Sequence, residues 1–587
     1  MGCLRASGGS ATSAANPPFC KRCPVLQTPL RSIPLLAAAS LLALCGVATA
    51  KAPRRPAPVP VVAVPPISAE TLKEVTRTLS SDAYEGRAPG TPGEDKTVAT
   101  IIDRFKAAGL KPGNKGRWTQ DVPTVIVEAK NHVPLTVKAE GQVLSFAFGA
   151  DYVAGSYRIT PRTDLADAPL VFVGFGVNAP EQGWNDYAGV DMKGKIAVIL
   201  VNDPDYEQAD ENGPFKGRRM TYYGRWRYKF EEAARQGAAG ALIVHDTFPA
   251  AYGWQVVQSS WSGKQKYVQS ATNGMDQTLA NGWIQKSTAE AILKASGQDL
   301  AALTAAAKVK GFKPVPLNAT ASLGFDNGIE RAMSHNVIGV QPGKARPNEY
   351  VLYTAHWDHL GRCKANAKGD DICNGAIDNA TGVAALVALA QANRKAGPPA
   401  RSQVFLAVTL EESGLLGSEF YASNPVYPLA RTVGGVNMDA LGMGSAARDI
   451  AVTGGDKSEL TRYLQTATRA MGLTITGETH PERGYYYRSD HFSFAKRGVP
   501  MFDVGRGSDW VNGGRAAGEA ASERYSNVDY HQPSDEFHED WDWSGPLQDV
   551  TLFYRLGRSL AETSDWPNWH KTDEFRLIRD RSRAGVK

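Results

Sequence analysis

Strand-like and helix-like runs alternate through residues 320–562, and this alternation constrains the fold more than any other feature of the 587-residue chain. Short runs such as YVLYTAH and SQVFLAV are separated by longer stretches with helical spacing, such as ATGVAALVALAQANRKAG. Chains with this pattern form α/β domains whose sheets are mostly parallel. We therefore predict an α/β fold, a doubly wound and mostly parallel sheet with helices on both faces.

The N-terminal residues are typical of an export signal. The apolar run IPLLAAASLLALCGVATA (33–50) ends in small residues, as in a secretory signal peptide that is cleaved after Ala50. One alternative is an uncleaved membrane anchor, for which the run is near the lower limit of length. Another is a lipoprotein box at Leu42–Cys45. We expect residues 1–50 to be a signal peptide and the mature protein to be periplasmic or extracellular.

Composition excludes several classes of protein. Hydrophobic residues make up 42% of the chain and charged residues 21%, which are values of a packed globular protein. The formal charge is +5, but residues 1–50 hold four basic residues and no acid. The remainder is close to neutral, so we expect no nucleic-acid partner. Residues 51–66 form a Pro-rich linker, and no later apolar run is long enough to predict a membrane span.

Only two of the six cysteines lie beyond the leader, Cys363 and Cys373. They are ten residues apart in a polar segment that is too irregular for a helix or strand. In an oxidising compartment, a disulfide that closes this loop is the favoured interpretation. Two free thiols are the alternative, and a cysteine-based metal site would need a second pair nearby.

Side chains that can bind metal follow the predicted strands. Because the carboxyl ends of parallel strands meet at one edge of a sheet, these side chains are expected to converge. Mixed nitrogen and oxygen ligands suit Zn²⁺, Co²⁺ or Mn²⁺, and two such ions ~3.5–4 Å apart need a carboxylate that bridges them. The sequence therefore predicts a site for a pair of zinc-type ions. The candidate residues are His356, Asp358, Asp378, Glu411, Glu412, Asp439 and His531.

The positions of neighbouring residues along an extended chain indicate which of them share a side of the chain. On an extended chain His356 and Asp358 point to the same side, so the Asp358 carboxylate can hold the ring N–H of His356. Glu411 and Glu412 point opposite ways along a strand. One of them can bind metal while the other takes a proton from metal-bound water.

Five motifs, in this order, resemble a known family. TAHWDHLG, NGAIDNATGVAAL, LEESGLLGSEF, VNMDALG and YHQPSDEF are similar to motifs of the zinc-dependent exopeptidase family of bacterial leucyl aminopeptidase, glutamate carboxypeptidase and the transferrin receptor. The resemblance implies two Zn²⁺ ions per chain, with Asp378 as the bridging ligand and a cis peptide bond between Asp378 and Asn379. The other ligands that it implies are His356, Glu412, Asp439 and His531.

The resemblance also implies catalytic roles. Glu411 would be the general base and acid for a metal-bridging water, and Asp358 would support His356. Tyr530 matches the tyrosine that hydrogen-bonds the developing oxyanion in carboxypeptidase-type members.

The middle of the chain resembles a protease-associated domain inserted in such peptidases. Its marks are PLVFVGFGVNAPEQGWNDYAGVDMKGKIAVILVND and FEEAARQGAAGALIVHD. We therefore predict an inserted α+β domain at 123–311, a peptidase domain formed by 67–122 and 312–565, and a C-terminal tail at 566–587.

The function predicted is that of a secreted dizinc exopeptidase acting on peptides or small proteins, and an aminopeptidase is the favoured type. A carboxypeptidase or dipeptidase of the same family is the alternative, and Arg488 and Arg506 could then meet a substrate carboxylate. A receptor-like member without catalysis is a further alternative, but such a protein would lack ligands, and here every ligand position is filled.

Overall fold

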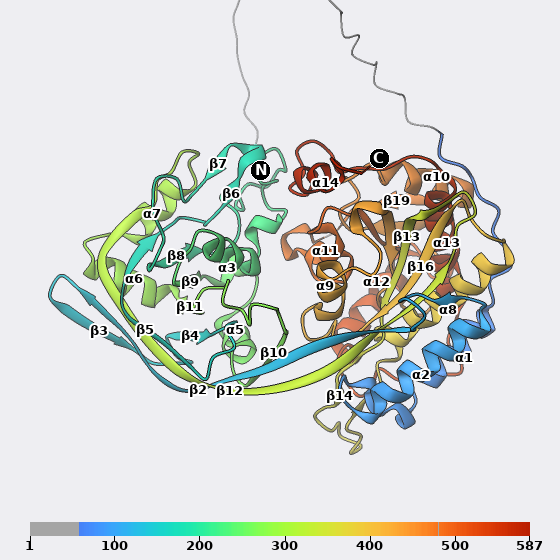
Figure 1. Cartoon of the computed structure of the whole chain (residues 1–587), viewed down its shortest axis with the longest axis horizontal. Helices are drawn as coiled ribbons and strands as arrows, with labels where there is room; N and C mark the ends of the chain where they lie inside the picture. The colour runs from blue at the N-terminus through green and yellow to red at the C-terminus, as the bar shows by residue number, and fades with distance from the viewer. Residues whose placement is uncertain (1–57, 479, 587) are drawn as a thin grey trace, which may run out of the picture. The chain divides into compact units, whose positions relative to one another are not determined.

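The computed structural model describes residues 58–478 and 480–586, so the predicted signal peptide and its cleavage site lie outside the described residues. Pro56–Lys587 is one compact unit (Figure 1). Within the described ranges, no helix combines the length and the apolar character needed to cross a bilayer.

A mixed, mostly parallel sheet forms the C-terminal half of this unit, which confirms the predicted α/β class. The neighbours β13 and β16, β13 and β17, and β17 and β20 are all parallel pairs, whereas β12 joins antiparallel beside β16. Across the sheet the strands are β19 (Thr474–Thr476), β18 (Asp449–Val452), β20 (Met501–Arg506), β17 (Thr432–Asn437), β13 (Arg346–His356), β16 (Arg401–Val408) and β12 (Val315–Gln341).

Helices cover both faces of this sheet. Because side chains of successive strand residues point to opposite faces, each central strand contributes to two apolar clusters. Tyr353 and Phe405 pack into one apolar cluster, whereas Leu352 and Leu406 pack into another. The first cluster includes residues of α1 (Ala69–Leu79), α2 (Pro92–Ala107), α8 (Thr381–Lys395), α10 (Thr461–Met471) and α13 (Ser544–Glu562). The second includes residues of α9 (Leu416–Ser423) and α11 (His491–Ala495).

The first two helices lie on either side of a Gly/Pro loop. The Ser68 hydroxyl accepts a hydrogen bond from the Thr71 N–H at the start of α1. The Thr91 hydroxyl caps α2 in the same way, with Pro92 in the first turn where its missing N–H costs nothing. These local signals explain why both helix starts are readable from the sequence.

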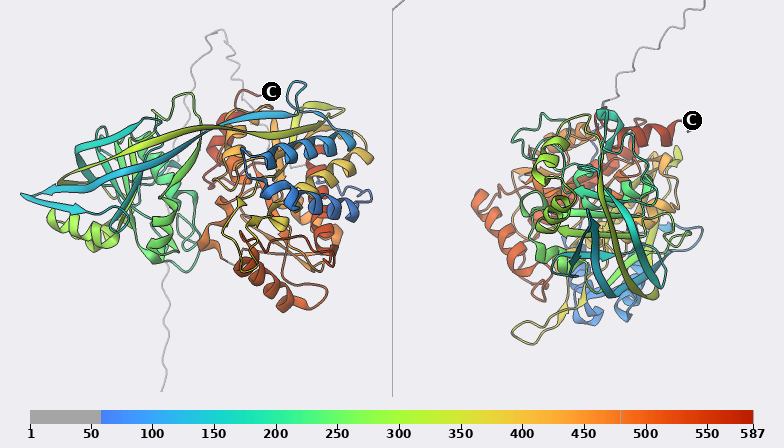
Figure 2. Two further views of the ribbon diagram at one scale, coloured as in Figure 1. Left: turned by 90° about the horizontal axis from the view of Figure 1, so that it is seen from below. Right: turned by 90° about the vertical axis from the view of Figure 1, so that its left-hand side faces the viewer.

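A long antiparallel pair is formed by β2 (Thr119–Ala139) and β12, and the same sheet continues beyond β12 into the remaining strands (Figures 1 and 2). The sequence predicts two short strands, TVIVEA and PLTVKA, where the structure has the single strand β2. The pairing with β12 shifts register near Gly324, so the ladder bends without ending. Beyond β12 lie β5 (Arg162–Phe172), β8 (Ile196–Leu200), β9 (Gly240–His245), β11 (Ala280–Gln285) and β4 (Tyr152–Gly155).

Candidate metal centre

The predicted ligands come from loops that follow the parallel strands. His356 is the last residue of β13, and Asp439 lies two residues after β17. Glu412 follows β16, and Asp378 lies in a π-helical turn (Ala376–Ala380) just before α8. The peptide bond between Asp378 and Asn379 is cis, which confirms that prediction.

Two groups of side chains meet at Asp378. Its Oδ1 lies 3.2 Å from His356 Nε2, which is also 3.1 Å from Asp439 Oδ1. Its Oδ2 lies 3.3 Å from His531 Nε2, which is also 3.0 Å from Glu412 Oε2. The two oxygens of one carboxylate therefore face two different histidine–carboxylate pairs, an arrangement suited to bridging two cations.

The chemistry of these atoms fits a divalent ion of the zinc type. Asp378 Oδ1 and His531 Nε2 are buried and make no hydrogen bond. His356, Asp378 and Glu412 each offer a ligand atom, and these atoms all lie within 4.8 Å of one another. Buried carboxylates at this density are costly unless a cation compensates them, and the donor set combines imidazole nitrogen with carboxylate oxygen.

Glu411 lies beside this group but not on a strand, so the prediction that Glu411 and Glu412 alternate along a strand is wrong. β16 ends at Val408, and Leu410 adopts a left-handed φ of 57° that turns the chain into a loop. Burial raises the pKa of the Glu411 carboxyl well above its ordinary value, and the neighbouring carboxylates add to the shift.

Asp358 connects two parts of the site. Its Oδ1 accepts a hydrogen bond of 3.1 Å from the Glu411 N–H, and its backbone carbonyl lies 3.2 Å from His356 Nδ1. The Asp358 carboxylate itself is 3.8 Å from His356 Nδ1. Burial raises the pKa of Asp358 to about 7. Asp358 thus orients His356 mainly through its backbone, and its carboxylate holds the loop that carries Glu411.

Tyr530 and His531 lie on one turn of the chain. Their rings stack with centroids 3.9 Å apart, and His531 has a left-handed φ of 60°. The Tyr530 side chain is 46% exposed, so its hydroxyl can reach solvent or a ligand. Burial and the nearby carboxylates raise the pKa of Tyr530 above its ordinary value, which keeps the phenol protonated as a donor.

Sequence reasoning missed Arg87, which supports the loops beneath the site. Its side chain is fully buried and donates to four backbone carbonyls, those of Leu79, Trp357, Asn374 and Gly375. Burial lowers the pKa of Arg87 to about 10. Nothing in the local sequence distinguishes this arginine from an exposed one.

We expect Arg87→Met to lower the free energy of unfolding by about 3–5 kcal/mol, because four buried acceptors would lose their donor. Urea-induced unfolding measures the change. The control is Arg77→Met, since Arg77 pairs with Glu539 on the surface and should cost under about 1 kcal/mol. Equal losses in the two variants would contradict the role given to Arg87.

Three further residues hold the ligands in place. The carboxylate of Asp535 accepts hydrogen bonds from the backbone N–H groups of Ile377 and Asp378, at 2.9 and 3.1 Å. His359 Nδ1 lies 2.7 Å from Glu412 Oε1, and the Ser489 hydroxyl donates to Asp439 Oδ2 at 2.5 Å. Asp535 falls inside the motif YHQPSDEF, which is the only signal in the sequence that could have found it.

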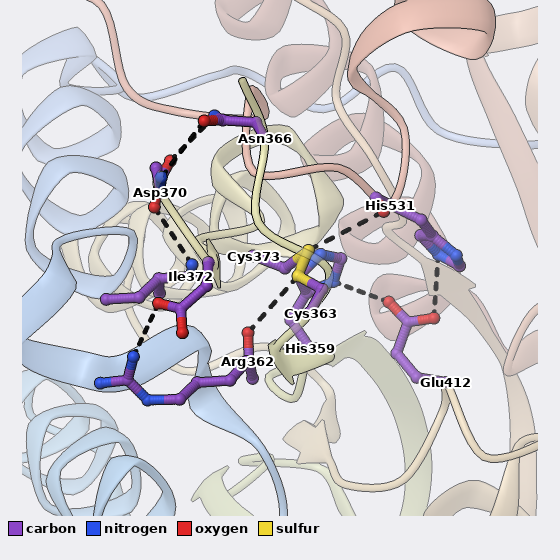
Figure 3. The surroundings of a disulfide bond; sticks show 11 residues. His359, Arg362, Cys363, Asn366, Asp370, Ile372, Cys373, Glu412 and His531 are labelled. Atoms are coloured by element: carbon purple, nitrogen blue, oxygen red, sulfur yellow. Dashed lines mark hydrogen bonds and ion pairs between the residues drawn. A yellow bond between two sulfur atoms is a disulfide. The ribbon is translucent and has the colours of Figure 1, made fainter. Parts of the chain in front are cut away.

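The predicted disulfide between Cys363 and Cys373 is present. Cys373 Sγ lies 3.8 Å from the carbonyl oxygen of His531, so the bridged loop contacts the segment that supplies this ligand (Figure 3). Figure 3 also shows Glu412 between His359 and His531.

A cavity of about 590 Å³ adjoins the site, and Asp439 is part of its wall. Asp503 and Glu478 line it as well, and burial raises the pKa of Glu478 to about 7. Apolar side chains complete the wall: Ile377, Leu441, Met443, Val504, Trp510 and Phe553.

The arginines of this cavity have other partners. Arg506, one of the predicted candidates for a substrate carboxylate, donates instead to backbone carbonyls within residues 442–445. Arg515 lies 3.9 Å from Asp449, and Arg524 lies 3.4 Å from Asp529. Glu478 Oε1, in contrast, is buried without a hydrogen bond.

Histidines and carboxylates that converge at the carboxyl edge of a doubly wound sheet, beside a cavity, define the class of metal-dependent hydrolases. Residues 336–554, which contain all the predicted ligands, match the sequence profile of peptidase family M28. This match confirms the predicted family over residues 336–554.

Curated relatives and solved structures show the same similarity. Aminopeptidase NAALADL1 of Mus musculus is 28% identical over 138 residues, which are 22% of this chain and 17% of that protein. The chain thus matches only about a sixth of this relative's length. An aminopeptidase from Aneurinibacillus sp. strain AM-1 is 21% identical, covering 85% of this chain and 95% of its own, with a TM-score of 0.43. A zinc aminopeptidase from Bacillus subtilis is 19% identical, covering 85% of this chain and 97% of its own, with a TM-score of 0.39.

Proposed function

We propose that the protein is an exported zinc aminopeptidase that removes apolar N-terminal residues from peptides. The observation that carries the proposal is the sharing of Asp378 between two histidine–carboxylate pairs. His356 with Asp439 would hold one Zn²⁺, His531 with Glu412 would hold the other, and Asp378 would bridge them. The predicted leader and the Cys363–Cys373 disulfide support export to an oxidising compartment.

The chain's own groups then account for the proton transfers. Bound zinc would polarise the scissile carbonyl and lower the pKa of water. The Glu411 carboxylate takes a proton from the attacking water and gives it to the leaving amine, and Asp358 fixes the Glu411 backbone for this step. The Tyr530 hydroxyl donates to the oxygen on which negative charge develops.

The cavity supports removal of N-terminal rather than C-terminal residues. Two carboxylates of its wall, Glu478, whose Oε1 makes no hydrogen bond, and Asp503, suit a substrate ammonium group, whereas its arginines are already engaged. The apolar part of its wall suits a side chain such as leucine. The names of the relatives, which are aminopeptidases, agree with this polarity.

Three dipeptide substrates test the polarity: Leu-Gly, N-acetyl-Leu-Gly and Leu-Gly amide. We expect N-acetylation to lower kcat/KM by roughly 10²-fold or more, because it removes the charge that the cavity carboxylates would bind. Hydrolysis of the N-acetylated dipeptide alone would instead establish a carboxypeptidase. Zinc-loaded protein that hydrolyses none of the three would contradict the proposed peptidase activity.

A further inference from the structure

The loop at 409–415, which connects β16 to α9, carries Glu411 in a tight turn. The Glu411 carbonyl accepts hydrogen bonds from the N–H groups of Gly414 and Leu415, at 2.8 and 2.9 Å. At the start of the turn, the Glu411 N–H donates to Asp358 at 3.1 Å. The direction of the Glu411 side chain therefore depends on the conformation of this turn.

The backbone of the turn is one that needs support from its surroundings. Leu410, Gly414 and Leu415 have left-handed φ angles of 57°, 99° and 65°. Residues other than glycine adopt this region at a cost, and they remain there only when neighbouring groups hold them. The contacts that surround the turn thus decide where Glu411 lies.

One of these contacts comes from residues 123–311, the predicted insert. Arg227 lies in the first turn of α3 (Trp226–Arg235) and is half-buried. Its Nη1 donates to the Gly414 carbonyl at 3.2 Å. A Cβ at Gly414 would lie 3.0 Å from Arg227 Nη2, so the guanidinium group packs directly on the turn.

A second contact from the same segment is apolar. Val268 is the last residue of β10 (Lys264–Val268), and it packs against the buried cluster that contains Leu410 and Leu416. These two leucines flank the turn, and the Leu416 N–H donates to the Leu410 carbonyl at 3.0 Å. Two separate elements of the predicted insert therefore meet the loop of Glu411.

We infer that Arg227 is a positioning residue for Glu411, through which the predicted insert supports proton transfer at the metal centre. The inference rests on the proposed function, because it takes Glu411 as the general base. The connection is short, since Gly414 accepts from Arg227 and itself donates to the Glu411 carbonyl. A charged donor makes a hydrogen bond roughly twice as strong as a neutral one, so the guanidinium group is a strong restraint on the turn.

The expected consequence of losing this restraint is a lower kcat. The Glu411 carboxylate would sample a wider range of positions, and proton transfer requires it within hydrogen-bond distance of the attacking water. The zinc ligands and the cavity wall do not include Arg227, so zinc content and KM should stay as they are.

The test measures kcat, KM and zinc content of Arg227→Met with Leu-Gly, using the full metal-loaded protein. We expect kcat to fall by ~10-fold or more, as for a displaced catalytic group, with KM and zinc content unchanged. Arg227→Lys should restore part of kcat, because an ammonium group can still donate to the Gly414 carbonyl. Val268→Ala should lower kcat in the same way by a smaller factor, which tests the same turn without removing a charge.

A double variant asks whether Arg227 acts through Glu411. In the Glu411→Gln background, Arg227→Met should cause little further loss of kcat, because the group that it positions is already absent. Arg235→Met is the matched control, since it removes an arginine of the same helix whose ion pairs with Glu231 and Glu232 lie within that helix. This control should leave kcat unchanged.

Three results would overturn the inference while leaving the proposed function intact. They are an unchanged kcat in Arg227→Met, a rise in KM without a fall in kcat, and a full further loss in the Glu411→Gln background. If the unchanged metal-loaded protein hydrolysed no peptide, the proposed function and the inference would fall together.

Discussion

Glu411→Gln is expected to retain bound zinc and to lose turnover by ~10²–10⁴-fold or more. The substitution keeps the size of the side chain and removes the carboxylate that is proposed to accept the proton of water. The backbone N–H of residue 411 can still donate to Asp358, so the loop should keep its conformation. Measurement of kcat together with metal content by mass spectrometry tests this expectation.

Glu412→Gln provides the matched comparison, since it changes the adjacent residue in the same way. Glu412 contacts both His359 and His531, and its loss should lower the metal content as well as kcat. Near-normal turnover by the Glu411→Gln variant would refute the assigned role. Loss of metal from both variants would show that residue 411 acts through the metal site instead.

Asp378→Asn should have the second large effect, a loss of metal from both proposed positions and a fall in kcat/KM of roughly 10³-fold or more. The reason is that Asp378 presents one oxygen to His356 and the other to His531. The amide would replace one of these oxygens by a donor and would remove the negative charge shared by the pair.

His356→Ala separates bridging from simple ligation. His356 faces only one oxygen of Asp378, so we expect this variant to keep about one zinc while Asp378→Asn keeps less. Asp371→Asn is the control, because Asp371 pairs with Arg362 on the surface. Metal content in Asp378→Asn equal to that of the unchanged protein would contradict the bridging role.

The sequence predicted which side chains converge at the edge of the sheet, because each of them follows a strand or precedes a helix that has its own local signal. His356 ends the largely apolar run YVLYTA, and Asp378 precedes a long Ala-rich helix. The supporting contacts were less predictable. Arg87 donates to carbonyls up to 288 residues away in the chain, and no local pattern records such a contact.

Two interpretations changed for a similar reason. Glu411 and Glu412 read as the end of a strand, yet the left-handed turn at Leu410 places them in a loop. The same reasoning predicted that the Asp358 carboxylate accepts the ring N–H of His356. That carboxylate instead accepts a hydrogen bond from the Glu411 N–H and lies 3.8 Å from His356 Nδ1. Alternation along an extended chain predicts side-chain direction only while the chain remains extended.

Local signals predicted the α/β class, the convergence of the candidate ligands and the disulfide, because each depends on residues close in sequence. The cis peptide bond was implied by the resemblance of the motif around Asp378. Tertiary structure alone decided that Asp378 lies between two histidines and that Arg506 donates to backbone carbonyls. Asp378 and His531 are more than a hundred positions apart, and Arg506 lies about 60 positions from the carbonyls that it contacts. These contacts depend on how the strands pair and how the loops pack, which the order of residues does not state.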